Sequence, residues 1–123
     1  MAHNQQLGIR GEQLARTYLE QKGYLLLARN YRIGRKELDL IMQDGDTIVF
    51  IEVKTRVGSE FGKPAEAVTV LKQKNLLAAA QGYLDQNQLQ EYPVRFDVVA
   101  IDLQQKTIQH IKNAFGSGSE YII

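Results

Sequence analysis

Hydrophobic residues follow two kinds of spacing along this chain, and these outline its secondary-structure elements. Short runs that alternate or are continuously apolar predict β-strands, and a spacing of three to four residues predicts α-helices. Strands are expected over residues 24–28, 37–43, 47–55, 94–102 and 107–112, and helices over residues 8–22 and 69–84. This α-β-β-β-α-β-β order predicts an α/β fold with a mixed β-sheet flanked by helices, because a strand–helix–strand crossover makes two strands parallel.

Individual residues mark where these elements begin, end and pack. Thr69 is placed to cap the start of the second helix, and Gly23 to end the first. The sequence 44–46, Asp-Gly-Asp, is a hairpin turn signal between the second and third strands. The inward face of the first helix carries Gly8, Gly11, Glu12, Ala15, Leu19 and Lys22. Its glycines would allow this helix to approach another element closely.

Three charged residues interrupt the apolar runs of the second and third strands. Asp39 lies within the run 37–43, and Glu52 and Lys54 lie near the end of the run 47–55. Burying a carboxylate or an ammonium group without a partner is costly. These residues are therefore expected either to form ion pairs, Lys54 with Glu52 or with Asp39, or to surround a metal ion.

The register of the hairpin decides how close the two carboxylates lie. A two-residue turn at 44–45 would place Asp39 opposite Phe50, with Glu52 as a diagonal neighbour. A turn at 45–46 would place Asp39 directly opposite Glu52. Both registers put the carboxylates on one face of the sheet, within about 5–8 Å of each other. A three-residue loop would put them on opposite faces.

Two carboxylates this close repel each other, and one would normally keep its proton. A divalent cation, Mg²⁺ or Mn²⁺, removes the conflict because it takes oxygen ligands. It also lowers the pKa of a bound water and withdraws charge from a phosphoryl oxygen. Lys54 would hold the attacking hydroxide or stabilise the transition state. Glu12 is expected either to reach this site from the first helix or to stay partly solvated in the helix's first turn.

Composition narrows the class of protein. The 123 residues suit one domain, expected over 1–115, followed by a flexible tail at 116–123. The chain has no cysteine, which excludes disulfides, Cys-ligated zinc and thiol catalysis. No apolar run approaches the roughly 20 residues that span a bilayer, and the amino terminus is polar, so we expect a cytoplasmic protein with no membrane partner.

The charge pattern suggests where phosphate groups would bind. The net charge is only +1, which argues against coating of nucleic acid through bulk charge. Basic residues instead gather before the second strand and after the third, and the candidates for phosphate contacts are Arg32, Arg35, Arg56 and Lys72. The alternative is that these residues form a solvated basic surface without a binding role. His110, in the last strand among apolar neighbours, is interpreted as structural.

With these residues in place, the chain resembles the PD-(D/E)xK nuclease superfamily, which has the restriction-endonuclease-like fold. More closely it resembles the bacterial YraN family, described as related to Holliday junction resolvases. The similarity covers about residues 7–115. It is carried by Gly8-Ile9-Arg10-Gly11-Glu12 with Ala15 and Tyr18-Leu19, by Glu37-Leu38-Asp39-Leu40-Ile41, by Val49-Phe50-Ile51-Glu52-Val53-Lys54-Thr55-Arg56, by Lys72 with Leu76 and Tyr83-Leu84, by Arg95-Phe96-Asp97-Val98-Val99, and by Ala114-Phe115.

The resemblance implies that Asp39, Glu52 and Lys54 form a nuclease core. Glu12 would be an additional acidic residue from the first helix, and Glu37 a further metal ligand. One position departs from the family pattern, which usually has glycine before the Glu-x-Asp string where this chain has Lys36. A side chain there could alter the entry to the hairpin or add a phosphate contact.

The leading hypothesis is a nuclease dependent on Mg²⁺ or Mn²⁺ that hydrolyses phosphodiester bonds, with DNA favoured over RNA. No feature suggests base-specific reading, which favours selection by nucleic-acid structure. Symmetric cutting of two strands would favour a homodimer. One alternative is a nucleic-acid-binding module with the same fold and no significant catalysis. Another is a protein-interaction domain whose charged strand residues are ion pairs.

Overall fold

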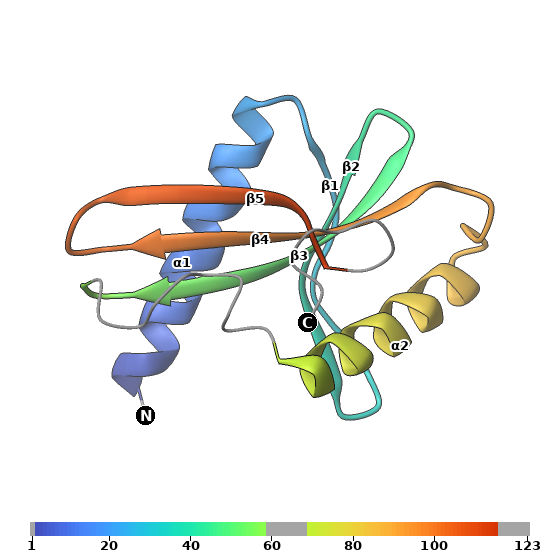
Figure 1. The fold of residues 1–123 in the computed structure, drawn as a ribbon, viewed down its shortest axis with the longest axis horizontal. Coiled ribbons are helices and arrows are strands. Elements are labelled where there is room, and N and C mark those ends of the chain that lie inside the picture. The colour runs from blue at the N-terminus through green and yellow to red at the C-terminus, as the bar shows by residue number, and fades with distance from the viewer. Residues whose placement is uncertain (1, 59–68, 116–123) are drawn as a thin grey trace.

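The computed structural model describes residues 2–58 and 69–115 of the 123-residue chain, and Figure 1 shows their arrangement. The element order is α-β-β-β-α-β-β, which confirms the predicted order. The elements are α1 (Ala2–Gln21), β1 (Leu25–Ile33), β2 (Lys36–Asp44), β3 (Thr47–Arg56), α2 (Val70–Gln86), β4 (Val94–Asp102) and β5 (Thr107–Phe115).

The five strands form a single sheet in the order β1-β2-β3-β4-β5. β3 and β4 are parallel, and the other neighbours are antiparallel. The parallel pair arises because α2 carries the chain from one end of β3 back to the start of β4. The sheet is therefore mixed, as the sequence predicts.

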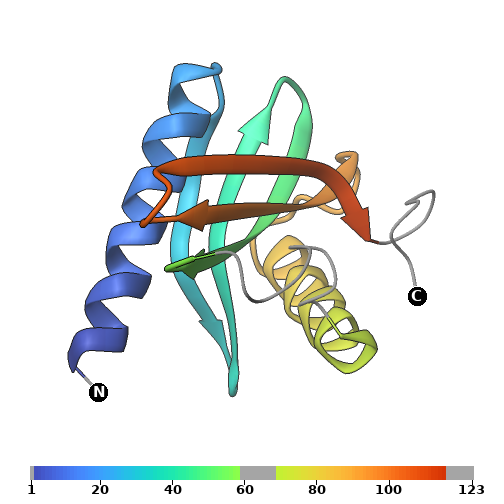
Figure 2. The ribbon, with the colours of Figure 1, turned by 60° about the vertical axis from the view of Figure 1, so that its left-hand side comes forward.

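The two helices cover opposite faces of the sheet (Figure 2). On the α1 face, Ala15 and Leu19 of α1 pack against Met42 and Val49 of the central strands. On the α2 face, Leu76, Ala80 and Tyr83 belong to one cluster with strand residues that include Leu38, Ile41, Phe50, Phe96 and Val98. Because β2, β3 and β4 are buried on both faces, their sequences read as nearly continuous apolar runs.

The first strand is longer than the sequence predicts. The expected strand ends at Ala28, whereas β1 continues to Ile33, which pairs with Lys36 across a turn at Gly34. The second half of β1 is polar because β1 is an edge strand, with its side chains exposed or half-buried. Periodicity finds strands through their buried side chains, so an edge strand of this kind gives a weak signal.

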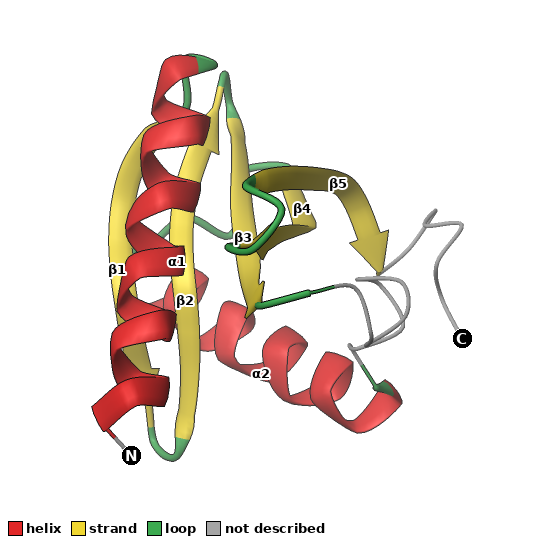
Figure 3. Ribbon diagram, turned by 90° about the vertical axis from the view of Figure 1, so that its left-hand side faces the viewer, coloured by secondary structure: helices red, strands yellow, loops and turns green. Residues whose placement is uncertain are grey.

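α1 begins at Ala2, earlier than the predicted residue 8. It contacts β3 more than any other strand and also contacts β1, β2 and β4, and Figure 3 shows it in front of β1 and β2. Gly23 follows its last turn with a φ of 96°, in the left-handed region that glycine adopts without strain. At the other end of the sequence, β5 extends to Phe115 beyond the predicted end at residue 112. The predicted N-cap of α2 is confirmed, since Thr69 accepts a hydrogen bond from the Lys72 amide.

Some expectations fall partly or wholly outside the described residues. The segment between β3 and α2 is described only up to Gly58 and again from Thr69, and the whole tail predicted at 116–123 lies outside the described residues. Within the described part of the chain, neither helix combines the length and the apolar character that crossing a membrane requires.

Candidate functional site

The β2–β3 hairpin adopts the register that brings the two strand carboxylates opposite each other. Asp44 pairs with Thr47 and Leu40 with Ile51, so the turn is at 45–46. One further step along the ladder would pair Asp39 with Glu52, but the backbone pairing ends at Leu40. There the Asp39 carboxylate accepts a hydrogen bond from the Val53 amide over 2.9 Å.

The ladder ends because the two strands separate. β2 stays paired with β1 down to Lys36, while β3 stays paired with β4 up to Arg56. Figure 1 shows β3 running with β4 and away from the β1–β2 hairpin. Asp39 and Glu52 are thereby placed at a fork in the sheet, where the backbones of β2 and β3 are no longer paired.

An open pocket of about 360 Å³ lies at this fork. Asp39, Glu52 and Lys54 line it from the strands, and Glu12 lines it from α1. The remaining lining residues are Gly8, Val53 and Thr55. The structure therefore brings together the four residues that the sequence singles out for catalysis.

Burial raises the pKa of Asp39 to about 8, and the neighbouring Glu52 carboxylate adds to the shift. The hydrogen bond from the Val53 amide opposes it only in part. The side-chain interaction with Glu52 also acts to raise the pKa of Asp39. Glu52 itself is only 8% exposed. Burial and the repulsion between the two carboxylates therefore favour a proton on Asp39, and a divalent cation would also relieve this repulsion.

Lys72, which is partly exposed, forms an ion pair with Glu52. Its Nζ is 3.0 Å from Glu52 Oε1. Burial acts to lower the pKa of Lys72, but the Glu52 carboxylate prevails and raises it. For Lys54 the direction is the opposite, because burial and then the neighbouring Lys72 lower its pKa. The sequence places Lys72 among the phosphate contacts and gives no local signal for this ion pair, since its partner is on a distant strand.

Glu12 points to the site from the wall formed by α1. Burial raises its pKa, and a hydrogen bond from Asn30 counteracts this. Asn30 lies in β1 with a φ of 49°, between two residues that pair with the neighbours of Asp39 in β2. Asn30 was not among the site residues predicted from the sequence. The one signal available was its residue type, since asparagine tolerates the left-handed region.

Among the described residues, no group of three or more His, Asp or Glu side chains lies close enough to hold a metal ion. The fork thus offers the pair Asp39 and Glu52. Such a pair suits Mg²⁺ or Mn²⁺, which bind through one or two carboxylates and complete their octahedral shell with waters and substrate phosphate. If a cation were bound there, Glu12, at the pocket wall, would be the residue to hold one of those waters.

The other predicted site residues are spread around the fork. Glu37 bonds Arg32, with 3.1 Å between Glu37 Oε2 and Arg32 Nε, and it is not among the residues that line the pocket. Arg56 has its Nε 4.0 Å from Asp102 Oδ2, so it lies beside an acidic partner within the fold. Arg35 is exposed in the β1–β2 turn.

Two further grooves adjoin the site. One, of about 690 Å³, runs between α1 and the β1–β2 hairpin, and its lining includes Glu12, Arg16 and Arg29. The other, of about 340 Å³, lies between the β1–β2 turn and the start of α2. Its lining includes Arg35, Lys36, Glu37 and Lys72. Basic side chains therefore accompany both grooves.

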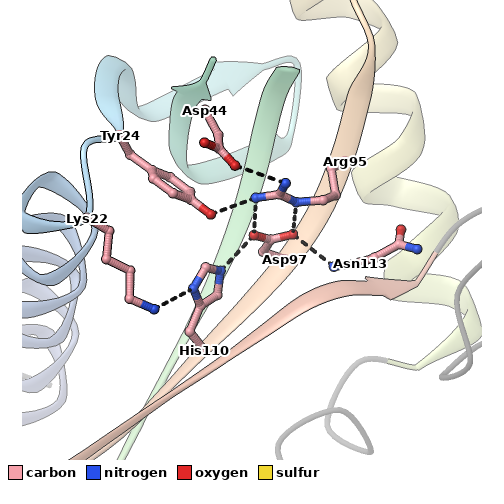
Figure 4. Close-up of polar contacts among 7 residues, drawn as sticks. All are labelled: Lys22, Tyr24, Asp44, Arg95, Asp97, His110 and Asn113. Atoms are coloured by element: carbon pink, nitrogen blue, oxygen red, sulfur yellow. Dashed lines mark hydrogen bonds and ion pairs between the residues drawn. The ribbon is translucent and has the colours of Figure 1, made fainter. Parts of the chain in front are cut away.

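A second cluster of charges, which the sequence did not reveal, lies away from the pocket (Figure 4). Its centre is Asp97 of β4, whose side chain is fully buried. Asp97 accepts hydrogen bonds from Arg95 Nε over 2.9 Å and from the Asn113 amide over 3.0 Å. Its other oxygen lies 2.7 Å from His110 Nε2. Burial acts to raise the pKa of Asp97, but the hydrogen bonds from His110 and Arg95 prevail and lower it.

The cluster continues outward from these residues. Arg95 also donates to the Tyr24 hydroxyl over 2.7 Å and pairs with Asp44 over 3.2 Å. Lys22 Nζ lies 3.5 Å from His110 Nδ1. The predicted structural role of His110 fits these contacts, although its closest partner is a carboxylate rather than the apolar residues expected.

Comparison with known proteins places the chain in a family. The model of the family described as "Uncharacterised protein family UPF0102" matches residues 11–101. A UPF0102 protein of Chlorobium chlorochromatii is 46% identical over an alignment of 118 residues, and the match covers 89% of this chain and 91% of the relative. A UPF0102 protein of Geobacter metallireducens is 45% identical and covers 92% of this chain and 94% of the relative. A third, of Thermodesulfovibrio yellowstonii, is 48% identical over 89% of this chain and 96% of the relative. The chain therefore belongs to the protein family UPF0102.

Proposed function

We propose that this protein is a nuclease dependent on Mg²⁺ or Mn²⁺ that hydrolyses phosphodiester bonds, with DNA as its substrate in preference to RNA. The observation that carries the proposal is the pair Asp39 and Glu52. Both carboxylates lie at the fork between β2 and β3, line the same open pocket and interact strongly enough that Glu52 helps to raise the pKa of Asp39. Such a pair is electrostatically unfavourable unless a proton or a cation lies between its members.

The residues of the pocket suit distinct roles in this reaction. Asp39 and Glu52 would hold the cation, and Glu12 would orient a water beside it. When bound, the cation lowers the pKa of a water and withdraws charge from the phosphoryl oxygens. Lys54, on the same strand as Glu52, would hold the attacking oxygen or stabilise the negative charge that develops on phosphorus.

The fold and the motif give further support. A mixed sheet with a parallel β3–β4 pair and helices on both faces fits the restriction-endonuclease-like architecture that the PD-(D/E)xK resemblance implies. Asp39 followed by Glu52-Val53-Lys54 supplies the acidic pair and the lysine of that motif. Contacts from Arg35 and other basic residues to phosphates would carry no sequence information, which suits selection by nucleic-acid structure. The proposed location of this activity is the cytoplasm.

The decisive experiment is calorimetric titration of Mn²⁺ into the wild type and into Asp39→Ala. We expect the wild type to bind and Asp39→Ala to lose binding by about a hundredfold or more, because loss of even a residue that only supports a metal ligand typically costs about 10–100-fold. Asp46→Ala is the matched control, because Asp46 is an exposed acidic residue in the turn of the same hairpin. Equal Mn²⁺ binding by wild type and Asp39→Ala would contradict the proposal. Where Mn²⁺ binds, branched, nicked and single-stranded DNA and RNA are then compared as substrates.

A second candidate is a nucleic-acid-binding module without significant turnover. The observation in its favour is the ion pair of Lys72 with Glu52, which compensates one carboxylate without any metal. This candidate predicts that DNA binding needs no divalent cation and survives Asp39→Ala. Electrophoretic mobility shifts in EDTA and in Mn²⁺, with wild type and Asp39→Ala, separate the two functions. Sedimentation with and without DNA tests the homodimer that symmetric cutting would favour.

A further inference from the structure

We propose that Lys72 is an exchangeable counter-cation of the site: its ammonium group neutralises Glu52 until a divalent cation binds, and is then displaced toward the groove beside α2. The inference rests on the proposed function, because it concerns the regulation of the same carboxylate pair. In this inference Lys72 acts on metal binding through its ion pair with Glu52, whereas the sequence predicts only a contact with phosphate.

The position of Lys72 is set by α2. The Lys72 amide donates to the Thr69 side chain over 3.2 Å, so its backbone is part of the helix cap. One turn later Leu76 is buried in the core cluster that also contains Phe50. The cap fixes the backbone at Lys72, and the buried Leu76 holds the helix against the sheet. The flexible Lys72 side chain then reaches Glu52, with 3.0 Å between Nζ and Glu52 Oε1.

Glu52 needs a positive partner in the absence of metal. It is 8% exposed and lies beside the acidic Asp39. A buried carboxylate without compensation is costly, and Lys72 supplies the compensation. A divalent cation on the same carboxylate would place two like charges close to the ammonium group. Binding of the metal and retention of the Lys72 contact therefore oppose each other.

A groove beside Lys72 can receive its displaced ammonium group. The Lys72 side chain is 38% exposed, and it lines the groove of about 340 Å³ that Arg35 and Lys36 line as well. Rotation of the lysine stem would carry the ammonium group from Glu52 into this groove without moving α2. The displaced cation would then join two other basic residues, so that metal loading would strengthen the groove for a substrate phosphate.

The test is Mn²⁺ binding to Lys72→Met by calorimetry at fixed pH and ionic strength. Removal of the competing ammonium group should tighten Mn²⁺ binding by about tenfold, within the usual range for coupling between two bound groups. Lys74→Met is the matched control, because Lys74 is an exposed lysine on the same helix and its loss changes the net charge equally. Lys74→Met should change the affinity less than about twofold, as expected for an exposed charge that salt screens. Lys72→Arg, which keeps the charge, should bind Mn²⁺ as the wild type does.

Thermal unfolding supplies a readout independent of activity. In EDTA, Lys72→Met should melt below the wild type, because Glu52 has lost its partner, and saturating Mn²⁺ should remove or reverse the difference. Unchanged or weaker Mn²⁺ binding by a folded Lys72→Met would overturn the inference while leaving the proposed function intact. Absence of Mn²⁺ binding in both wild type and Lys72→Met would overturn the proposed function, and this inference with it.

Discussion

Asp39 has a pKa far above the ordinary value of an aspartate. Burial and then the Glu52 carboxylate raise its pKa from 3.8 to about 8. In the unfolded chain the group titrates near its ordinary value, so between about pH 4 and pH 8 the folded protein binds more protons than the unfolded one. Protonated Asp39 therefore stabilises the fold at low pH, and this contribution is lost as the pH rises through about 8.

The first prediction concerns Asp39→Asn, which cannot ionise. In EDTA, the free energy of unfolding of the wild type relative to Asp39→Asn should fall by on the order of a few kcal/mol as the pH rises from about 4.5 to about 8.5. Urea denaturation at several pH values measures the two curves. Asp46→Asn, at an exposed position of the same hairpin, should keep the slope of the wild type. Parallel curves for wild type and Asp39→Asn would show that Asp39 does not carry the shift.

α1 is positioned on the sheet by a close contact with the end of β3. A Cβ atom added at Gly11 would lie 1.8 Å from Thr55 Oγ1 and 3.0 Å from Thr55 Cβ. At Gly8, one turn earlier, an added Cβ would meet nothing within 4 Å. The close approach expected from both glycines is therefore confirmed at Gly11 alone. Since Thr55 follows Lys54, this contact also sets how near α1 lies to the pocket.

The second prediction compares alanine at the two glycines. Gly11→Ala should lower the free energy of unfolding by about 1–3 kcal/mol through overpacking against Thr55. Gly8→Ala should be neutral or should stabilise by up to about 1 kcal/mol, because alanine is the better helix former. Adding Thr55→Ala to Gly11→Ala should recover part of the loss. Equal effects of the two alanines in urea denaturation would disprove the role assigned to this contact.

The buried Asp97 cluster ties distant parts of the molecule to one another. Through Arg95 and His110 it joins β4 to β5, to the end of β2 and to the residues that follow α1. Its residues do not line the pocket at the fork. Hydrogen bonds from His110 and Arg95 outweigh burial and lower the pKa of Asp97. Its contribution to stability is thus present at neutral pH and is lost as the pH falls, opposite in sign to that of Asp39.

The third prediction is that Asp97→Asn lowers the free energy of unfolding by about 3–5 kcal/mol, because it removes the fully buried carboxylate that both Arg95 and His110 contact. The loss should shrink toward acid pH, where the wild type also loses the charge. The Mn²⁺ affinity of the folded variant should equal that of the wild type. A loss no larger than that of Asp46→Asn in urea denaturation would mean that the cluster contributes little to stability.

Local pattern was enough to predict most elements of the fold and the core of the candidate site. Alternation placed Asp39 and Glu52 on strands joined by a two-residue turn, and two of the possible registers already put them on one face. The helix cap at Thr69 was likewise visible, because capping depends on neighbours in sequence. The polar half of β1 escaped prediction because an edge strand buries too little to leave a periodic signal.

The contacts that complete the site are of another kind. Neither the ion pair of Lys72 with Glu52 nor the hydrogen bond of Asn30 with Glu12 could be predicted from the sequence. Each joins residues that come together only after the strands are paired and the helices docked. The order of the elements and the chemistry of the strand residues are therefore readable from the chain itself. The partner of each charge depends on long-range packing, because burial and proximity, which shift pKa values and select ion pairs, exist only in the folded protein.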